Sequence, residues 1–263
     1  MATREVDIKA WERAEIKRSG VQAAQTEASV SSDTPSNIAR YMDPPAGTCF
    51  PLEYAFHLLG EARGKAVLEL GCGSGENSHL LAHRGARVWA MDISESLTGL
   101  ARRRAAVNRV SGEVTCFVAS AYDIPLPDES VDVVFGIAIL HHLDLELAAR
   151  EVRRVLKKGG RAIFQEPVRN SKFVSRVRSL IPYHAPDVSP FERPLTDQEL
   201  RTFANGFSGY HSRSFMLPYV SVAHIIPVVR ERTHHLLRLD RAILNRFPRL
   251  AYYGGIRVVE MTR

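Results

Sequence analysis

The sequence predicts an α/β fold in which helices cover both faces of a parallel sheet. Three observations predict it: strand-like apolar runs alternate with helical stretches between about residues 66 and 165, the first run ends at a glycine-rich turn, and the second ends at Asp92. Alternating strands and helices are typical of parallel sheets, because each crossover helix packs on one face of the sheet. The 263 residues, 45% of them hydrophobic and 24% charged, suffice for one large α/β domain with a lid.

Hydrophobic periodicity and turn residues predict the elements in order along the chain. Strands are expected at about 66–70, 86–91, 113–118, 131–136, 161–165, 209–215 and 256–261. Helices are expected at about 4–18, 52–59, 76–83, 94–107, 145–155 and 196–204, with a helical insertion at about 219–250. The apolar contacts expected for the first helix are Val6, Ile8, Trp11 and Ile16. Residues 22–36 are rich in Ala, Ser, Thr and Gln, so residues 1–36 are expected to be an N-terminal helix and a flexible linker, and 37–263 the main domain.

Three alternating glycines follow the first apolar run, in the order Gly71-Cys72-Gly73-Ser74-Gly75. Because glycines carry no side chain, a ligand can approach the main chain closely there. The helix that begins near Glu76 directs its unpaired N–H groups to the same place. Asp92 ends the next strand, where a carboxylate can accept both hydroxyl groups of a ribose. The chain is therefore expected to hold a cofactor that contains a nucleoside.

The glycine spacing indicates which cofactor this is. The third glycine comes one residue earlier than in the dinucleotide pattern G-x-G-x-x-G, and Glu69 stands two residues before the first glycine. A carboxylate there would repel a pyrophosphate and attract the ammonium group of a methionine moiety. The pattern E-x-G-x-G-x-G, the later Asp92 and the run Leu156-Lys157-Lys158-Gly159-Gly160 resemble the class I S-adenosylmethionine-dependent methyltransferases. The resemblance is to the small-molecule branch with a methyltransferase 11 type of domain, which includes quinone methylases, and it covers about residues 37–215.

This resemblance implies a Rossmann-like seven-stranded sheet with six parallel strands and an antiparallel last strand. It also implies a lid at about 168–195 and S-adenosylmethionine as the cofactor, with S-adenosylhomocysteine as its product. The cofactor-binding residues at matching positions are Tyr41, Glu69, Gly71, Cys72, Gly73, Gly75, Asp92, Ile93, Ser120, Ala121, Ile137 and His141. Asp92 would hold the ribose, Ile93 would pack on the adenine, and the Ala121 N–H would reach the ring.

Two of these positions are open to another interpretation. The family carries an Asp that accepts a hydrogen bond from the adenine amino group where this chain has Ser120, and a hydroxyl is a poorer acceptor than a carboxylate. Asp123 is a substitute acceptor or simply a turn residue before a proline. Tyr41 either closes over the methionine end of the cofactor or packs in the core.

Methyl transfer from a sulfonium requires an aligned acceptor, exclusion of water and, for a hydroxyl or a protonated amine, removal of a proton. The candidate catalytic residues are His141 and His142 after the fourth strand, Glu166 after the fifth, and His184 in the lid. A histidine titrates near neutral pH and suits a general base. In the family the first histidine of this pair often borders the cofactor, so His141 has two candidate roles. No acidic and histidine cluster shows metal-ligand spacing, so no metal is expected.

The chain is expected to be a cytoplasmic enzyme that methylates a small molecule, most simply at oxygen, with nitrogen, sulfur and carbon acceptors open. Three cysteines without metal spacing suit a reducing compartment. The N-terminus lacks the apolar core of a signal peptide, and no run reaches the roughly 20 apolar residues of a membrane span. A lipophilic or aromatic acceptor is suggested by the apolar residues of the insertion, which are Val220, Val222, Ile225, Ile226, Val228 and Val229.

The charge distribution leaves rival interpretations. Residues 230–249 hold six arginines and two histidines against two acidic residues. This segment is either a solvated face or a surface that binds an anionic substrate, an anionic membrane or nucleic acid. Nucleic acid is disfavoured as a partner, because the aromatics nearby do not interleave with the charges. Gly136-Ile137-Ala138-Ile139 also replaces the Asn/Asp-Pro-Pro-Tyr/Phe motif of enzymes that methylate base amines. A nonenzymatic cofactor-binding protein and a nicotinamide-dependent reductase are the other rivals, and the oligomeric state is left open.

Overall fold

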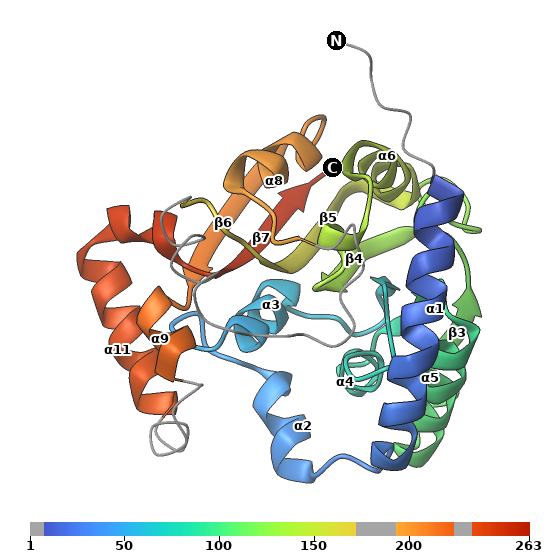
Figure 1. The fold of residues 1–263 in the computed structure, drawn as a ribbon. Helices are drawn as coiled ribbons and strands as arrows, with labels where there is room; N and C mark the ends of the chain where they lie inside the picture. The colour runs from blue at the N-terminus through green and yellow to red at the C-terminus, as the bar shows by residue number, and fades with distance from the viewer. Residues whose placement is uncertain (1–7, 172–192, 224–232) are drawn as a thin grey trace.

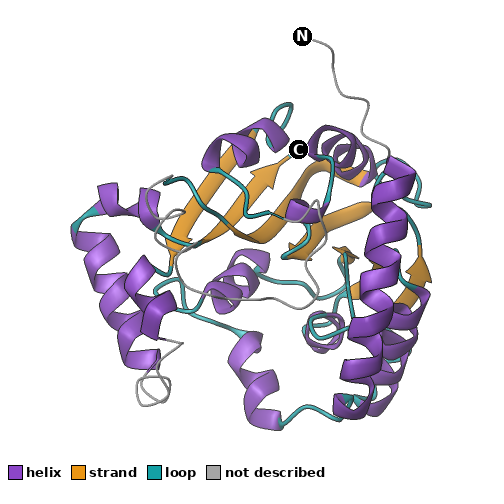
Figure 2. Ribbon diagram, viewed as in Figure 1, coloured by secondary structure: helices purple, strands orange, loops and turns teal. Residues whose placement is uncertain are grey.

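A computed structural model describes residues 8–171, 193–223 and 233–263 of the chain. These residues build one seven-stranded sheet with helices packed on both faces (Figure 1, Figure 2). The strands are β1 (Ala66–Leu70), β2 (Arg87–Asp92), β3 (Val114–Val118), β4 (Val131–Ile137), β5 (Leu156–Pro167), β6 (Gly209–Phe215) and β7 (Ile256–Thr262). Six of these strands lie close to the positions that the sequence predicts, whereas β5 begins at Leu156 instead of near residue 161.

The strand order in the sheet is β3-β2-β1-β4-β5-β7-β6. Strands β1 to β5 pair in parallel, and β7 pairs antiparallel with both β5 and β6. The expectation of six parallel strands and an antiparallel last strand is therefore confirmed. The order reverses between β1 and β4, and in open α/β sheets the crevice outside the carboxyl ends of the strands at such a point is where ligands bind.

Several helices begin at a side chain that caps their first turn. Ser94 accepts a hydrogen bond from the Leu97 N–H at the start of α5 (Glu95–Val107), and Thr196 forms a capping box with Glu199 at the start of α8 (Asp197–Phe203). The longer helices are α1 (Ile8–Thr26), α2 (Pro35–Met42), α3 (Pro51–Leu59), α5 (Glu95–Val107), α6 (Leu145–Val155) and α11 (Thr233–Arg246). The shorter ones are α4 (Ser78–His83), α8 (Asp197–Phe203) and α9 (Pro218–Ala223), with 3-10 turns η1 (Glu27–Ser29), η2 (Leu140–His142) and η3 (Pro248–Tyr253).

Two apolar cores lie on opposite faces of the sheet. The first joins α3, α4 and α5 to the sheet and includes Phe56, Leu81 and Phe135. The second lies under α6 and α8 and includes Phe164 and Phe203, whose rings meet edge to face 5.4 Å apart. Because both faces are covered, β1 is buried along its whole length and β4 along most of its length, and the sheet is a rigid support for the loops at its carboxyl edge.

The N-terminal helix differs from its prediction. Helix α1 runs to Thr26 rather than to residue 18, so the first residues of the predicted linker are helical. Ile16, expected as an apolar contact, is 46% exposed, whereas Glu15 and Ser19 are buried. The helix lies on α5 through a small cluster of Ala23, Leu97 and Leu100. The buried face of α1 is thus mostly polar, which hydrophobic periodicity does not detect. The division of the chain at residue 36 stays a prediction.

The basic segment forms α11 at the β6 edge of the sheet, whereas α1 lies near the opposite, β3 edge (Figure 1). Asp240 of α11 is buried and accepts the Met216 and Leu217 N–H groups, both at 2.9 Å, which ties the helix to the end of β6. Of the six apolar residues that suggest a lipophilic acceptor, Val220 is fully buried and packs in the core; the other five side chains lie outside the described ones, so the character of the acceptor stays a prediction. In the described parts of the chain, no helix has both the length and the apolar character needed to cross a bilayer.

Candidate functional site

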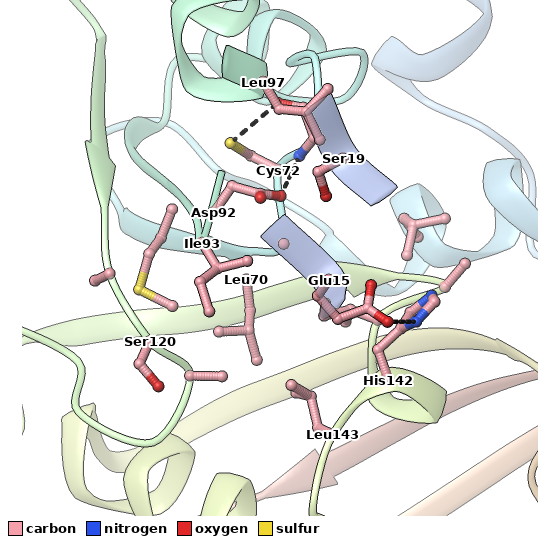
Figure 3. A pocket seen from close by; sticks show the side chains of 18 of the residues that line it. Glu15, Ser19, Leu70, Cys72, Asp92, Ile93, Leu97, Ser120, His142 and Leu143 are labelled. Atoms are coloured by element: carbon pink, nitrogen blue, oxygen red, sulfur yellow. Dashed lines mark hydrogen bonds and ion pairs between the residues drawn. The ribbon is translucent and has the colours of Figure 1, made fainter. Parts of the chain in front are cut away.

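A cavity of about 440 Å³ opens at the carboxyl ends of β1, β2 and β4 and is covered on its outer side by α1 (Figure 3). This volume lies in the range of small-molecule pockets. The predicted site residues that line it are Gly71, Cys72, Gly73, Asp92, Ile93, Ser120, Ala121, Ile137, His141 and His142. The structure therefore brings together, at the switch point of the sheet, residues that lie up to 71 positions apart (142 − 71) in the sequence.

The three glycines all have positive φ angles, but the space around them differs. A Cβ atom on Gly71 (φ 72°) would lie 2.6 Å from the Ile139 side chain, and one on Gly75 (φ 80°) would lie 2.8 Å from the Ala101 Cα. Gly73 (φ 52°) has no atom within 4 Å of such a Cβ among the described residues, and it lines the cavity. Gly71 and Gly75 therefore permit close packing, while Gly73 leaves open the space in which a ligand can approach the backbone.

Asp92 is placed by the loop that it faces. Its Oδ2 accepts the Gly73 N–H at 2.9 Å, and its Oδ1 accepts the Ser94 N–H at 2.9 Å. Burial raises the pKa of this carboxyl, and the two backbone hydrogen bonds act in the opposite direction. Since each carboxylate oxygen has two lone pairs, both oxygens of Asp92 can accept a further hydrogen bond from a ligand.

Three predicted cofactor residues lie behind the cavity wall, outside the described lining. Glu69 is buried and accepts a hydrogen bond from the Ser78 hydroxyl, and burial raises the pKa of its carboxyl to about 8. Tyr41 packs on Phe56 with ring centroids 5.0 Å apart, which matches its interpretation as a core residue. Gly75 supports the turn from behind. A direct contact of Glu69 with an ammonium group stays a prediction.

The histidine pair follows β4 and faces the cavity. His141 Nδ1 lies 2.8 Å from Glu166 Oε2, and Glu166 Oε1 accepts the Ile139 and Leu140 N–H groups at 2.9 and 2.8 Å. Glu166 is fully buried, so this carboxylate holds both the loop and the histidine ring. Because Glu166 acts as the acceptor, we assign the proton to Nδ1, which leaves Nε2 as the basic nitrogen of His141.

The neighbouring His142 contacts α1. Its ring centroid lies 4.1 Å from that of His141, and its Nδ1 lies 3.4 Å from Glu15 Oε1 (Figure 3). Glu15 also receives a hydrogen bond from Arg18 Nε at 3.0 Å. Of the four catalytic candidates, His141 and His142 thus line the cavity, Glu166 supports His141 from behind, and His184 lies outside the described residues.

A third part of the wall consists of residues 119–122. The Ser120 hydroxyl accepts the Tyr122 N–H at 3.1 Å and donates to Glu12 Oε1 at 2.5 Å. Asp92, Ile93 and Ser120 follow one another along one side of the cavity (Figure 3). A ribose held at Asp92 would therefore place its base over Ile93 and against residues 119–122.

The wall formed by α1 was not predicted from the sequence. The residues of α1 that line the cavity are Trp11, Glu12, Glu15, Arg18, Ser19 and Gln22. Trp11, Glu15, Arg18 and Gln22 recur at the spacing of one helix face, i, i+4, i+7 and i+11. This spacing was the available signal, but the positions are mostly polar and carry no hydrophobic pattern.

The connection after α1 is tied to the glycine loop. His79 Nε2 lies 3.0 Å from Asp33 Oδ2, and His79 Nδ1 lies 3.1 Å from the Gly75 carbonyl oxygen. Asp33 also accepts a hydrogen bond from the Asn37 amide at 2.6 Å. Partial burial acts to raise the pKa of Asp33, but the hydrogen bonds from His79, Asn37 and the Thr34 N–H outweigh it and lower this pKa. The segment between α1 and α2 is thereby fixed beside the site.

The residues present fit an adenosyl cofactor. The open space at Gly73, the two acceptor oxygens of Asp92 and the apolar Ile93 provide for a backbone contact, a ribose and a base, in that order. Among the residues that the structure describes, no group of three or more histidine, cysteine or acidic side chains could hold a metal ion.

Residues 68–164 match the family model described as a methyltransferase domain. A probable S-adenosylmethionine-dependent methyltransferase of Mycolicibacterium smegmatis is 32% identical over 136 residues, which are 51% of this chain and 51% of that protein. A ubiquinone biosynthesis O-methyltransferase of Pseudomonas fluorescens is 32% identical over 139 residues, 50% of this chain and 60% of that protein. This chain therefore spans only about half the length of the first of these relatives.

Solved structures share the fold. The geranyl diphosphate C-methyltransferase of Streptomyces coelicolor, solved with Mg²⁺, geranyl diphosphate and S-adenosylhomocysteine, superposes with a TM-score of 0.55 at 22% identity, covering 80% of this chain and 76% of that one. A possible histamine N-methyltransferase of Thermotoga maritima gives a TM-score of 0.55 at 19% identity, covering 81% and 86%. With the matching family model, the curated relatives and the seven-stranded sheet, this chain contains a class I S-adenosylmethionine-dependent methyltransferase domain.

Proposed function

We propose that the chain is an enzyme that transfers a methyl group from S-adenosylmethionine to a small-molecule acceptor, at an oxygen atom. The observation that carries this proposal is the position of His141, which lines the same cavity as Gly73 and Asp92 and is oriented by buried Glu166. The cofactor residues and a candidate base thus meet in one pocket of small-molecule size.

Binding and alignment are the main tasks of the protein. When bound, the cofactor supplies a methyl group already activated on a sulfonium. Asp92 would accept the ribose hydroxyls, the backbone of the glycine loop would lie against the cofactor, and α1 would cover the pocket and exclude water. These contacts orient the donor toward the histidine pair.

Proton removal is assigned to His141. Its Nδ1–H is held by Glu166 at 2.8 Å, so Nε2 can take the proton that an acceptor hydroxyl must lose when it is methylated. Glu166 fixes the tautomer and the ring orientation and is a positioning residue. A base of this kind favours an oxygen acceptor, because a hydroxyl must lose its proton and an already neutral amine need not lose one before attack.

The acceptor is proposed to be a small molecule rather than RNA. The cavity is covered by α1, whose Glu12 and Glu15 place carboxylates at its wall, and carboxylates repel phosphate groups. The basic helix α11 lies at the β6 edge, away from this cavity (Figure 1). The relatives named above include a ubiquinone biosynthesis O-methyltransferase, which supports an aromatic acceptor such as a phenol.

The test combines binding and turnover. Titration calorimetry of the full chain should show micromolar binding of S-adenosylhomocysteine and none of NADH or of a short RNA. A labelled methyl donor is then offered with phenols, carboxylic acids, amines and thiols. His141→Gln is expected to lower kcat about 100-fold or more, because the proton transfer is lost. The affinity for S-adenosylhomocysteine, measured on the same variant, distinguishes the role of His141 as a base from its role as a cofactor contact. His234→Gln, on exposed α11, is the matched control. Absence of S-adenosylhomocysteine binding by the unmodified chain would contradict the proposal.

A further inference from the structure

We propose that Glu12 of α1 supplies the carboxylate that recognises the amino group of the adenine base. This inference rests on the proposed function, since it concerns the same cofactor. It assigns to the N-terminal helix a direct role in cofactor specificity, one that compensates for the hydroxyl residue Ser120 on the sheet side of the pocket.

The position of the base follows from the position of the ribose. Asp92 faces the cavity at the end of β2, and Ile93 is the next residue along the wall (Figure 3). A base attached to a ribose at Asp92 extends over Ile93 and brings its far edge to Ser120 and Ala121. The groups that discriminate one purine from another lie on this edge.

Ser120 is a weaker acceptor for an amino group than a carboxylate, because it is uncharged and one of its two lone pairs is already used. Its oxygen already accepts the Tyr122 N–H at 3.1 Å, and its proton points to Glu12 Oε1 at 2.5 Å. The nearby carboxylate therefore belongs to Glu12, which also lines the cavity. A carboxylate offers about four lone-pair positions, of which the Ser120 hydroxyl uses one.

The resulting edge is complementary to adenine. The carboxylate of Glu12 can accept a hydrogen bond from the amino group, and the backbone N–H of Ala121 can donate to the adjacent ring nitrogen. In hypoxanthine the amino group is replaced by a carbonyl oxygen, and the adjacent ring nitrogen carries a proton. A carboxylate facing this carbonyl oxygen is repulsive, so the pocket should reject an inosine cofactor.

Helix α1 is held firmly enough to carry such a group. Glu15 is buried one turn further on and contacts His142, and Ala23 packs on Leu97 and Leu100 of α5. Base recognition and docking of the helix are therefore coupled, because the same segment closes the pocket and reads the base.

The experiment compares S-adenosylhomocysteine with S-inosylhomocysteine by titration calorimetry of the full chain. The unmodified chain should prefer the adenosine compound by at least about tenfold. In Glu12→Gln the amide can rotate to donate to the carbonyl oxygen, so this preference should fall by about tenfold or more. Glu27→Gln removes an exposed carboxylate that pairs with Arg103 outside the pocket, and it should leave both affinities unchanged.

A rescue variant separates recognition from folding. Adding Ser120→Asp to Glu12→Gln returns a carboxylate to the edge from the sheet side and should restore the preference for adenosine. If Glu12→Gln weakens both compounds by the same factor, or changes neither, Glu12 does not read the base and the inference is overturned while the proposed function stands. If the unmodified chain binds neither compound, the proposed function itself is contradicted.

Discussion

The cavity has two walls that are held in place in different ways. The sheet wall is fixed by the backbone: Gly73 donates to Asp92, and two main-chain N–H groups hold Glu166 behind His141. The α1 wall is fixed by side chains, through Glu12 to Ser120 and Glu15 to His142. The sheet wall is therefore part of the folded sheet, whereas the contacts of the α1 wall can be weakened without unfolding the sheet.

The largest effect is expected on the sheet wall at Asp92. Asp92→Asn replaces one acceptor oxygen by a donor and removes the charge, so the affinity for S-adenosylhomocysteine should fall about 100-fold, on the basis of two charge-assisted hydrogen bonds. Calorimetry measures this loss. Asp128→Asn, in an exposed ion pair with Arg154, is the matched control and should leave the affinity unchanged. A loss below about threefold would mean that Asp92 only braces the loop.

Two glycines of the same loop sharpen the contrast between packing and binding. Gly71→Ala places a methyl group 2.6 Å from Ile139 at a positive φ and should lower the free energy of unfolding by about 2–4 kcal/mol. Gly73→Ala meets no described atom and should cost about 1–2 kcal/mol from its φ alone, while it blocks the ligand. Urea denaturation measures both. Equal losses would show that strain rather than packing determines the stability of this loop.

Glu69 allows the sheet wall to be tested through pH. Burial raises its pKa in the folded state from 4.5 to about 8, so the folded state binds more protons than the unfolded state between these values. Stability from this group should therefore fall as the pH rises through this window, by at most about 1.4 kcal/mol per pH unit. Glu69→Gln should remove the trend, as measured by denaturation at several pH values; a parallel pH dependence in both proteins would refute it.

The smallest effect is expected where the α1 connection joins the loop. Asp33→Asn removes the carboxylate that meets His79 and should lower stability by about 1 kcal/mol. Because the pKa of Asp33 is lowered in the folded state, its contribution is present above the unfolded pKa of about 3.8 and is lost as the pH falls through the lower folded value. Limited trypsin digestion should become faster in α1, at Lys17 or Arg18, while core fragments persist. Unchanged digestion would place the restraint on α1 elsewhere.

The sheet wall could be predicted from the sequence because its function resides in local backbone geometry. Few local backbone structures are compatible with alternating glycines after an apolar run and an acidic residue at the end of the next strand. The α1 wall could not be predicted in this way, since Glu12 and Glu15 are placed at the cavity by contacts with Ser120 and His142, which lie more than a hundred residues later in the sequence. Strand β5 is another example: it begins at Leu156 rather than near residue 161, because Leu156 pairs with Val131 of β4 before a register shift that brings Arg161 opposite Val133.

The cover formed by α1 has a consequence for the timing of turnover. A cofactor bound between Asp92 and Glu12 would be partly covered by α1, so movement of this helix would widen its path into and out of the cavity. Such a movement would break the contacts to Ser120 and His142 together, and it would speed the exchange of spent cofactor. Weaker packing of the N-terminal helix would therefore shorten the residence time of the cofactor and raise the rate of its exchange.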